Sequence, residues 1–164
     1  MAKFGCCRHW SLTILVLTAT LCCGSVAAAQ KGHFRGLAVL MNTQFSQLKA
    51  PGDHPGGGVM QGEMDGLVFN DAKAPFLDKA HYQVVWKADG SGAGDCFKTF
   101  TMHNGDKVFA RCEGRPTPTG SEGTVTLVGG TGAYAGITGQ GSFKVTNVSD
   151  RVLWDLLDWD YELP

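Results

Sequence analysis

Hydrophobic and polar residues alternate along most of the chain from residue 34 onward. A period of two is typical of half-buried β-strands, because successive side chains of a strand point to opposite faces. In the first such segment, residues 34–48, the alternating face consists of Leu37, Val39, Met41, Thr43 and Phe45. The pattern therefore predicts a half-buried strand here, with this set as its apolar face.

Seven further segments have strand-like composition, and glycine- or proline-bearing turns separate them. The eight predicted strands are residues 34–48, 59–69, 80–88, 96–102, 106–113, 124–128, 139–148 and 152–163. This spacing of short strands and turns is typical of an all-β barrel. A helix over residues 150–157 is the alternative for the start of the last segment. Residues 50–58 form either an ordinary connection or a mobile lid.

The last segment would close the barrel by pairing with the first, which removes both sheet edges. Its apolar face contains Leu153, Leu157, Trp159, Tyr161 and Leu163, with Asp155 as an interruption. We therefore expect one all-β domain, a single closed antiparallel barrel of about eight strands over residues 30–164.

Residues 128–143 contain six glycines, and part of this run fits the G-x-G-x-x-A form of a dinucleotide fingerprint. That fingerprint requires a helix to begin in the loop, so that its N-terminus faces the pyrophosphate. Gly136, Gly139 and Gly141 oppose a helix, since each costs about 1 kcal/mol relative to alanine. The run instead predicts a strand, a tight turn plugged by Tyr134 and Ile137, and a second strand. No nucleotide cofactor is expected.

The run GGTGAYAGITGQGSF resembles the glycine-rich strand–turn–strand signature of allene oxide cyclase and dirigent-like β-barrels, including secreted bacterial members of that group. The resemblance is sharpest over residues 122–145 and extends loosely from residue 34 to the end. It implies a closed antiparallel barrel. It also implies, as one alternative, a metal-free cyclase, isomerase or dirigent-like activity, but it transfers no catalytic residue to this sequence.

The first 29 residues have the order of a secretory signal peptide. Lys3 and Arg8 precede an apolar core at residues 12–21, and small residues at 27–29 offer a cleavage site. The core is shorter than the roughly 20 residues that span a bilayer. We expect cleavage after Ala29 and export to the periplasm or the extracellular space, with lipidation at Cys22 or Cys23 as the minor alternative.

The chain remaining after cleavage carries 12 basic and 15 acidic residues. This balance gives no basic face for nucleic acid or for an anionic membrane. We expect no nucleic-acid partner and no stable membrane span after cleavage. The oligomeric state is left open.

Cys96 and Cys112 are the cysteines that remain after cleavage, and two cysteines in an exported chain favour a disulfide. Residues 103–105 (HNG) predict a hairpin turn. A three-residue loop pairs Met102 with Asp106 and places Cys96 opposite Cys112; a two-residue turn would shift this register by one. Free or metal-bound thiols are the alternative. The four histidines of the cleaved chain show no zinc-ligand spacing beside these cysteines, and no metal is expected.

Candidate functional residues fall into two sets. An eight-stranded barrel can be filled by side chains or can hold one small ligand, and the residues proposed to line it are Tyr82, Trp86, Phe100 and Phe109. An ordinary aromatic residue of a packed core is the simpler interpretation of each. The polar candidates for chemistry are Glu63, Asp65, Arg111 and Glu113, although a solvated outer face is the simpler reading of the two acids on residues 59–69. Alternation places Arg111 and Glu113 on the face opposite Cys112.

Three functions are consistent with these features. The first is an exported barrel that binds a small apolar molecule. The second is a cofactor-independent isomerase, cyclase or dirigent-like protein. The third is a structural or interaction protein with a filled barrel. No G-x-S-x-G, Walker A, H-E-x-x-H or EF-hand pattern occurs in the sequence.

Overall fold

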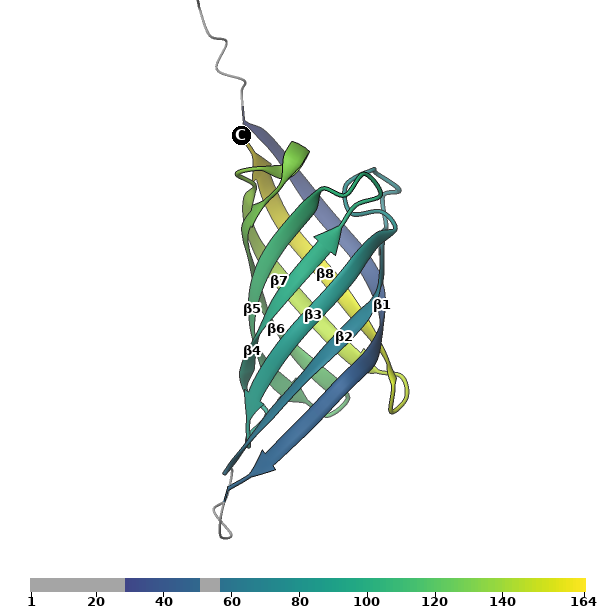
Figure 1. Cartoon of the computed structure of the whole chain (residues 1–164). Helices are drawn as coiled ribbons and strands as arrows, with labels where there is room; N and C mark the ends of the chain where they lie inside the picture. The colour runs from purple at the N-terminus through teal and green to yellow at the C-terminus, as the bar shows by residue number, and fades with distance from the viewer. Residues whose placement is uncertain (1–28, 51–56) are drawn as a thin grey trace, which may run out of the picture.

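A computed structural model describes residues 29–50 and 57–164. Eight antiparallel strands form a closed barrel in which each strand pairs with the next along the chain (Figure 1). The strands are β1 (Gln30–Lys49), β2 (Gly58–Asn70), β3 (Ala80–Asp89), β4 (Gly94–Thr101), β5 (Lys107–Thr117), β6 (Gly120–Gly130), β7 (Thr138–Asn147) and β8 (Val152–Leu163). The predicted signal peptide and most of the predicted 50–58 connection lie outside the described residues.

The first and last strands close the barrel. β1 pairs with β8 over twelve residue pairs, from Gln30 with Leu163 to Met41 with Val152. This closure pairs the first strand with the last along residues 30–41, whereas residues 44–49 of β1 extend past β8 and pair with β2 alone. The prediction that the last segment is a strand is confirmed, and the helix over residues 150–157 is not formed.

The predicted orientation of β1 is wrong for residues 34–41. Phe34, Gly36, Ala38 and Leu40 are buried there, whereas Val39 and Met41 are exposed on the outer face. Past a register shift between Asn42 and Gln44, Phe45 lines the opening of the barrel interior. Both faces of this strand are apolar, so alternation alone could not distinguish them. The outer residues join neighbours on β2 and β8 in an exposed apolar patch: Val39, Met41, Leu67, Phe69, Trp154 and Leu156.

The hairpin between β5 and β6 is longer than the sequence predicted. One predicted strand ends at residue 113 and the next begins at residue 124, and the two prolines of residues 114–120 favour a connection between them. The strands instead continue pairing to Thr117 and Gly120, with Pro116 opposite Ser121 near the end of the ladder. Proline is tolerated at such terminal positions because fewer ladder hydrogen bonds depend on it.

The glycine-rich run forms the predicted strand, turn and strand. β6 leads into a single 3₁₀ turn, η1 (Gly132–Tyr134), and β7 follows at Thr138. Gly132 and Gly136 have φ angles of 55° and 78°, a region that strongly favours glycine. Ile137 is buried and Tyr134 packs against the core, as predicted for the plug.

One half of the barrel interior is filled with large side chains. This packed half includes Phe34, Phe76, Leu77, Phe100, Ile137 and Trp159. The ring centroids of Phe34 and Trp159 are 5.3 Å apart. Phe76, from the β2–β3 connection, packs against Tyr161 in a tilted arrangement with ring centroids 4.2 Å apart. Ile137 follows η1 and Trp159 lies near the end of β8, so the packed half lies toward the end of the barrel at which Figure 1 shows η1 and the C-terminus.

The predicted disulfide between Cys96 and Cys112 is present. The two cysteines are directly opposed on β4 and β5, with Cα atoms 5.0 Å apart. The Met102 amide donates to the Asp106 carbonyl at 2.8 Å, which is the three-residue hairpin loop that sets this register.

Reduction of this disulfide is expected to lower the free energy of unfolding by about 3 kcal/mol, because the open chain regains loop entropy when unfolded. Urea unfolding of residues 30–164 with and without reductant measures the difference. A Cys96→Ala/Cys112→Ala variant is the control, since reductant should leave its midpoint unchanged. Two thiols that label in the unfolded, unreduced protein would contradict the bond itself.

Candidate functional site

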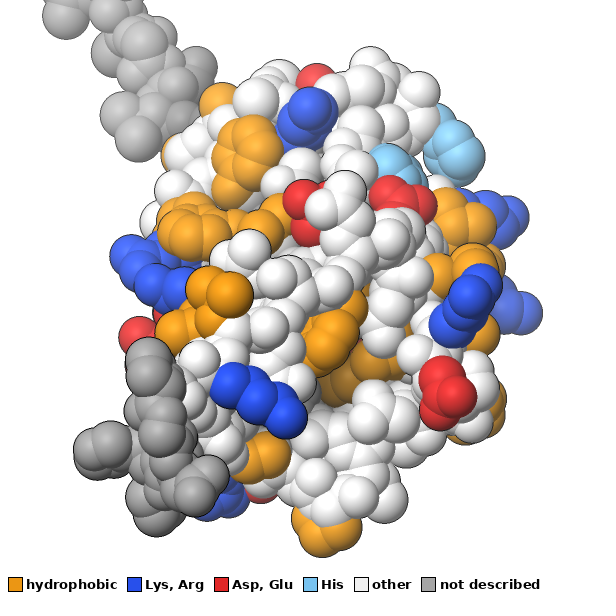
Figure 2. Space-filling view, turned by 60° about the horizontal axis from the view of Figure 1, so that its bottom comes forward, with side chains coloured by type: hydrophobic (Ala, Val, Ile, Leu, Met, Phe, Trp, Pro, Cys, Tyr) orange, Lys and Arg blue, Asp and Glu red, His pale blue; other side chains and the backbone are white. Residues whose placement is uncertain are grey.

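The other half of the barrel is hollow and open at the end opposite η1. A cavity of about 390 Å³ lies inside the barrel at this end. Figure 2 shows its opening as a recess with hydrophobic side chains inside it. Its apolar lining includes Met60, Met64, Val84, Trp86, Phe143 and Leu153. The volume lies within the roughly 300–1,000 Å³ typical of small-molecule sites.

The floor of the cavity carries buried charges. Lys98 Nζ donates to Asp155 Oδ2 at 2.8 Å, and the Tyr82 hydroxyl donates to the same oxygen at 2.7 Å. Lys98 is 2% exposed and Asp155 1% exposed, and both line the cavity. We call Lys98, Asp155 and Tyr82 the polar cluster.

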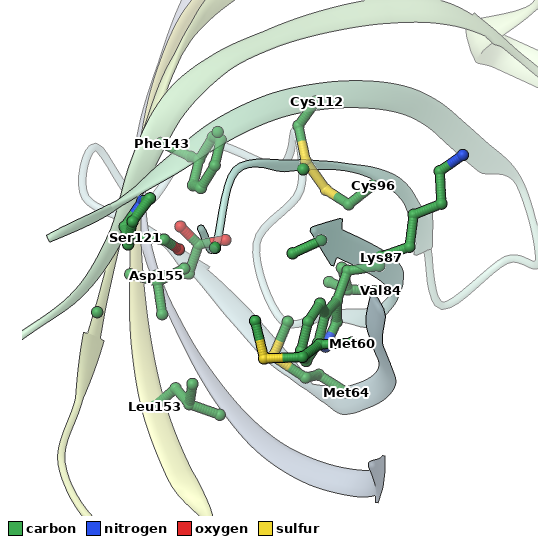
Figure 3. Close-up of a pocket in the computed structure, with 18 of the residues that line it drawn as sticks. Met60, Met64, Val84, Lys87, Cys96, Cys112, Ser121, Phe143, Leu153 and Asp155 are labelled. Carbon is green, nitrogen blue, oxygen red and sulfur yellow. A yellow bond between two sulfur atoms is a disulfide. The ribbon is translucent and has the colours of Figure 1, made fainter. Parts of the chain in front are cut away.

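Three different strands bring the polar cluster together. Tyr82 lies on β3, Lys98 on β4 and Asp155 on β8, each on the inward face of its strand. Figure 3 shows Asp155 and Phe143 on one side of the cavity and Met60 and Met64 on another, while Lys87 extends away from it. Lys98 and Asp155 line the cavity, and Tyr82 stacks on Phe100 of the packed half with ring centroids 4.4 Å apart. The polar cluster therefore lies between the hollow half and the packed half.

Burial shifts the pKa of both Lys98 and Tyr82. It lowers the pKa of the Lys98 amine, and the neighbouring Asp155 carboxylate offsets part of that effect. Burial also raises the pKa of Tyr82 well above its ordinary value, and Asp155 adds to the rise. Lys98 Nζ further lies 4.3 Å from the centre of the Phe143 ring, a favourable cation–π distance.

Two buried polar atoms beside the cavity have no hydrogen-bond partner within residues 29–50 and 57–164. They are Asp155 Oδ1 and Trp86 Nε1. A buried polar atom without a partner costs about 1–3 kcal/mol. The residues that line the cavity therefore include one buried acceptor and one buried donor that have no hydrogen-bond partner in the described chain.

The proposed aromatic lining is only partly placed at the cavity. Trp86 lines it, Tyr82 belongs to the polar cluster, and Phe100 lies in the packed half. The prediction that Phe109 lines the barrel interior is wrong. Its neighbours Val108 and Ala110 are buried in the barrel, so alternation turns Phe109 to the outer face.

The four polar candidates all lie on the outer face. Glu63 and Asp65 flank the inward-facing Met64, and Asp65 Oδ1 lies 2.7 Å from His81 Nε2. The Arg111 guanidinium lies 5.3 Å from the Phe97 ring. The cavity lining includes neither these residues nor Glu113, so the simpler reading of the two acids, a solvated outer face, agrees with the geometry.

The sequence analysis identified Tyr82 but not the two charged residues of the polar cluster. No role was predicted for Lys98, and Asp155 was interpreted as an interruption of an apolar face. A signal was present, because alternation places Lys98 with Cys96 and Phe100, and Asp155 with Leu153 and Leu157. Two opposite charges on inward faces of one small barrel can be buried only if they pair.

In the described part of the chain, no helix is long and apolar enough to cross a membrane. Within the same residues, no group of three or more His, Cys, Asp or Glu side chains is arranged to hold a metal ion.

The barrel can be compared with known proteins. No family model matches the sequence, and no curated protein does. Among solved structures, a pterocarpan synthase dirigent protein is similar with a TM-score of 0.53 and 15% identity, over 83% of this chain and 86% of that chain. A pyocyanin demethylase gives a TM-score of 0.44 and 19% identity, over 74% of this chain and 97% of its own. At these identities the likeness concerns the fold alone: the chain shares its eight-stranded barrel fold with a dirigent protein.

Proposed function

We propose that this barrel binds a small, mainly apolar molecule in its hollow half. The observation that carries the proposal is the open cavity of about 390 Å³, lined largely by apolar side chains and ending at the polar cluster. Sites for small molecules are usually apolar recesses with a few convergent polar groups. Asp155 and Trp86 line the cavity, and each carries a buried polar atom without a partner in the described chain: the acceptor Asp155 Oδ1 and the donor Trp86 Nε1.

The place of action that we propose is outside the cytoplasm, in the periplasm or the extracellular space. The signal-peptide pattern of residues 1–29 supports it. So does the disulfide between Cys96 and Cys112, because such bonds persist mainly in oxidising compartments.

A cofactor-independent isomerase or cyclase is the second candidate, and the polar cluster favours it. Lys98, Asp155 and Tyr82 can each hold or release a proton, and they lie where a bound molecule would end. The third candidate, a structural protein with a filled barrel, has less support, because the hollow half is open to solvent.

Ligand binding can be tested with N-phenyl-1-naphthylamine, a neutral dye whose fluorescence rises in apolar surroundings. Residues 30–164 are expected to bind it at one site. Ala88→Phe places a ring in the cavity and should weaken binding by about tenfold, equivalent to about 1.4 kcal/mol. Val85→Phe, on the outer face of the same strand, is the matched control and should bind like the unmodified protein.

Equal binding by both variants would place the dye elsewhere on the protein and would overturn the proposal. Native mass spectrometry of protein purified from an exported preparation provides a second readout. A co-purifying small molecule that Ala88→Phe loses and Val85→Phe retains would support the proposal and identify the ligand.

A further inference from the structure

Lys98 is a primary amine at the end of a mostly apolar, open cavity. Its side chain is 2% exposed, yet the residue lines the space that a ligand would occupy. Lys31 and Lys87, by contrast, have side chains that are 79% and 66% exposed. Lys98 therefore differs from these surface lysines both in its burial and in its position in the wall of the cavity.

Two features of the surroundings favour a reactive amine. Removal of water disfavours the charged ammonium, so burial lowers the pKa of Lys98. Desolvated lysines in apolar pockets are the usual lysine nucleophiles toward carbonyl carbon. Asp155 Oδ2 lies 2.8 Å from Nζ, within reach for exchanging a proton with it.

We propose that Lys98 forms an imine with an apolar aldehyde that enters the hollow half, with Asp155 as the proton carrier and the counter-ion. This inference rests on the proposed ligand-binding function and names the chemical class that the site would take: a molecule with an apolar body and a terminal aldehyde.

The reaction balances without an oxidant or reductant. Asp155 takes a proton from the Lys98 ammonium, and the freed lone pair attacks the aldehyde carbon. The carbonyl oxygen takes a proton from Asp155, which then accepts the second nitrogen proton, giving a neutral carbinolamine. Asp155 returns that proton to the hydroxyl group as the carbon–oxygen bond breaks and water leaves. The nitrogen lone pair forms the C=N bond, and the resulting iminium retains the single positive charge that Lys98 carried.

The remaining contacts fit these steps. Asp155 Oδ1 has no hydrogen-bond partner among the described residues, so it is free to accept a hydrogen bond from the carbinolamine hydroxyl. The Tyr82 hydroxyl donates to Oδ2 at 2.7 Å and holds the carboxylate in place. The Phe143 ring, 4.3 Å from Nζ, would stabilise the cationic iminium as it now stabilises the ammonium.

The test uses cinnamaldehyde as the probe and sodium cyanoborohydride to reduce any imine to a stable amine. Residues 30–164 are treated with one equivalent of aldehyde and analysed by intact mass and peptide mapping. The expected product gains the mass of one aldehyde less one oxygen atom, and the modification maps to Lys98. Excess cinnamyl alcohol, which has the same apolar body but no carbonyl group, should suppress the labelling.

Two variants complete the design. Lys87→Arg removes an exposed lysine at the cavity opening and should leave the labelling unchanged. A triple variant, Lys98→Met/Asp155→Leu/Tyr82→Phe, removes the whole polar cluster without leaving an unpaired charge, and it should lose the single modification. Labelling spread over exposed lysines, with Lys98 unmodified in the unmodified protein, would overturn the inference.

Cinnamyl alcohol separates this inference from the proposed function. Its binding is measured directly by displacement of N-phenyl-1-naphthylamine. Displacement without aldehyde labelling at Lys98 would overturn the imine and leave the binding function standing. Failure of the protein to bind either the dye or the alcohol would overturn both.

Discussion

Replacement of Lys98 by methionine is expected to lower the free energy of unfolding by about 3–5 kcal/mol. The substitution leaves the Asp155 carboxylate 1% exposed and without its cationic partner, while its Oδ1 atom already has no hydrogen-bond partner in the described chain. A buried charge without a counter-charge costs far more than the attraction that the pair contributes. Urea unfolding at neutral pH measures the loss.

Two controls separate this cost from the loss of a long side chain. Lys87→Met, at an exposed position beside the same opening, should change stability by no more than about 0.5 kcal/mol. The triple variant described above should be more stable than Lys98→Met alone, because replacing a whole buried ionic group by apolar residues is often neutral. Equal stability of Lys98→Met and Lys87→Met would show that Lys98 and Asp155 do not form a buried pair in solution.

Trp159→Ala is expected to cost about 3–5 kcal/mol through loss of packing. Trp159 is 1% exposed and contacts Phe34 and Phe100, with ring centroids 5.3 Å and 5.4 Å away. Its removal would open a second space in the packed half, which rigid strands on every side cannot fill by relaxation.

The matched control for Trp159 lies on the same strand. Trp154 is 48% exposed on the outer face, so Trp154→Ala should cost about 0.5 kcal/mol. Comparison of the two urea midpoints tests the assignment of faces on β8. A larger loss from Trp154→Ala would mean that the apolar patch on the outer face is covered in solution.

Much of the fold was predictable from local patterns. Alternation identified eight strands, and the glycines after Val128 excluded the helix that a nucleotide site needs. The three-residue hairpin loop placed Cys96 opposite Cys112, so the disulfide followed from local register. These features depend on residues that are near one another in the chain, and turn chemistry constrains such residues strongly.

The candidate site was much less predictable. Of the four proposed aromatic residues, Trp86 lines the cavity, and Phe109 lies on the outer face. The charges at the cavity floor were not recognised as a site, because Lys98 and Asp155 are 57 residues apart and each looks like a single irregularity in an apolar strand.

The sequence by itself determined the number and order of the strands and which cysteines pair, since each depends on alternation or on a short loop. Only the tertiary structure decided which face of β1 is inside. Phe34, Ala38 and Leu40 alternate with Val39 and Met41, so both faces of the strand are apolar. The pairing of β1 with β2 and β8 turns the face of Phe34, Ala38 and Leu40 toward the barrel interior. The same closure brings Lys98 to Asp155 and leaves one half of the interior hollow. Such contacts depend on how distant strands meet, and alternation within one strand carries no information about them.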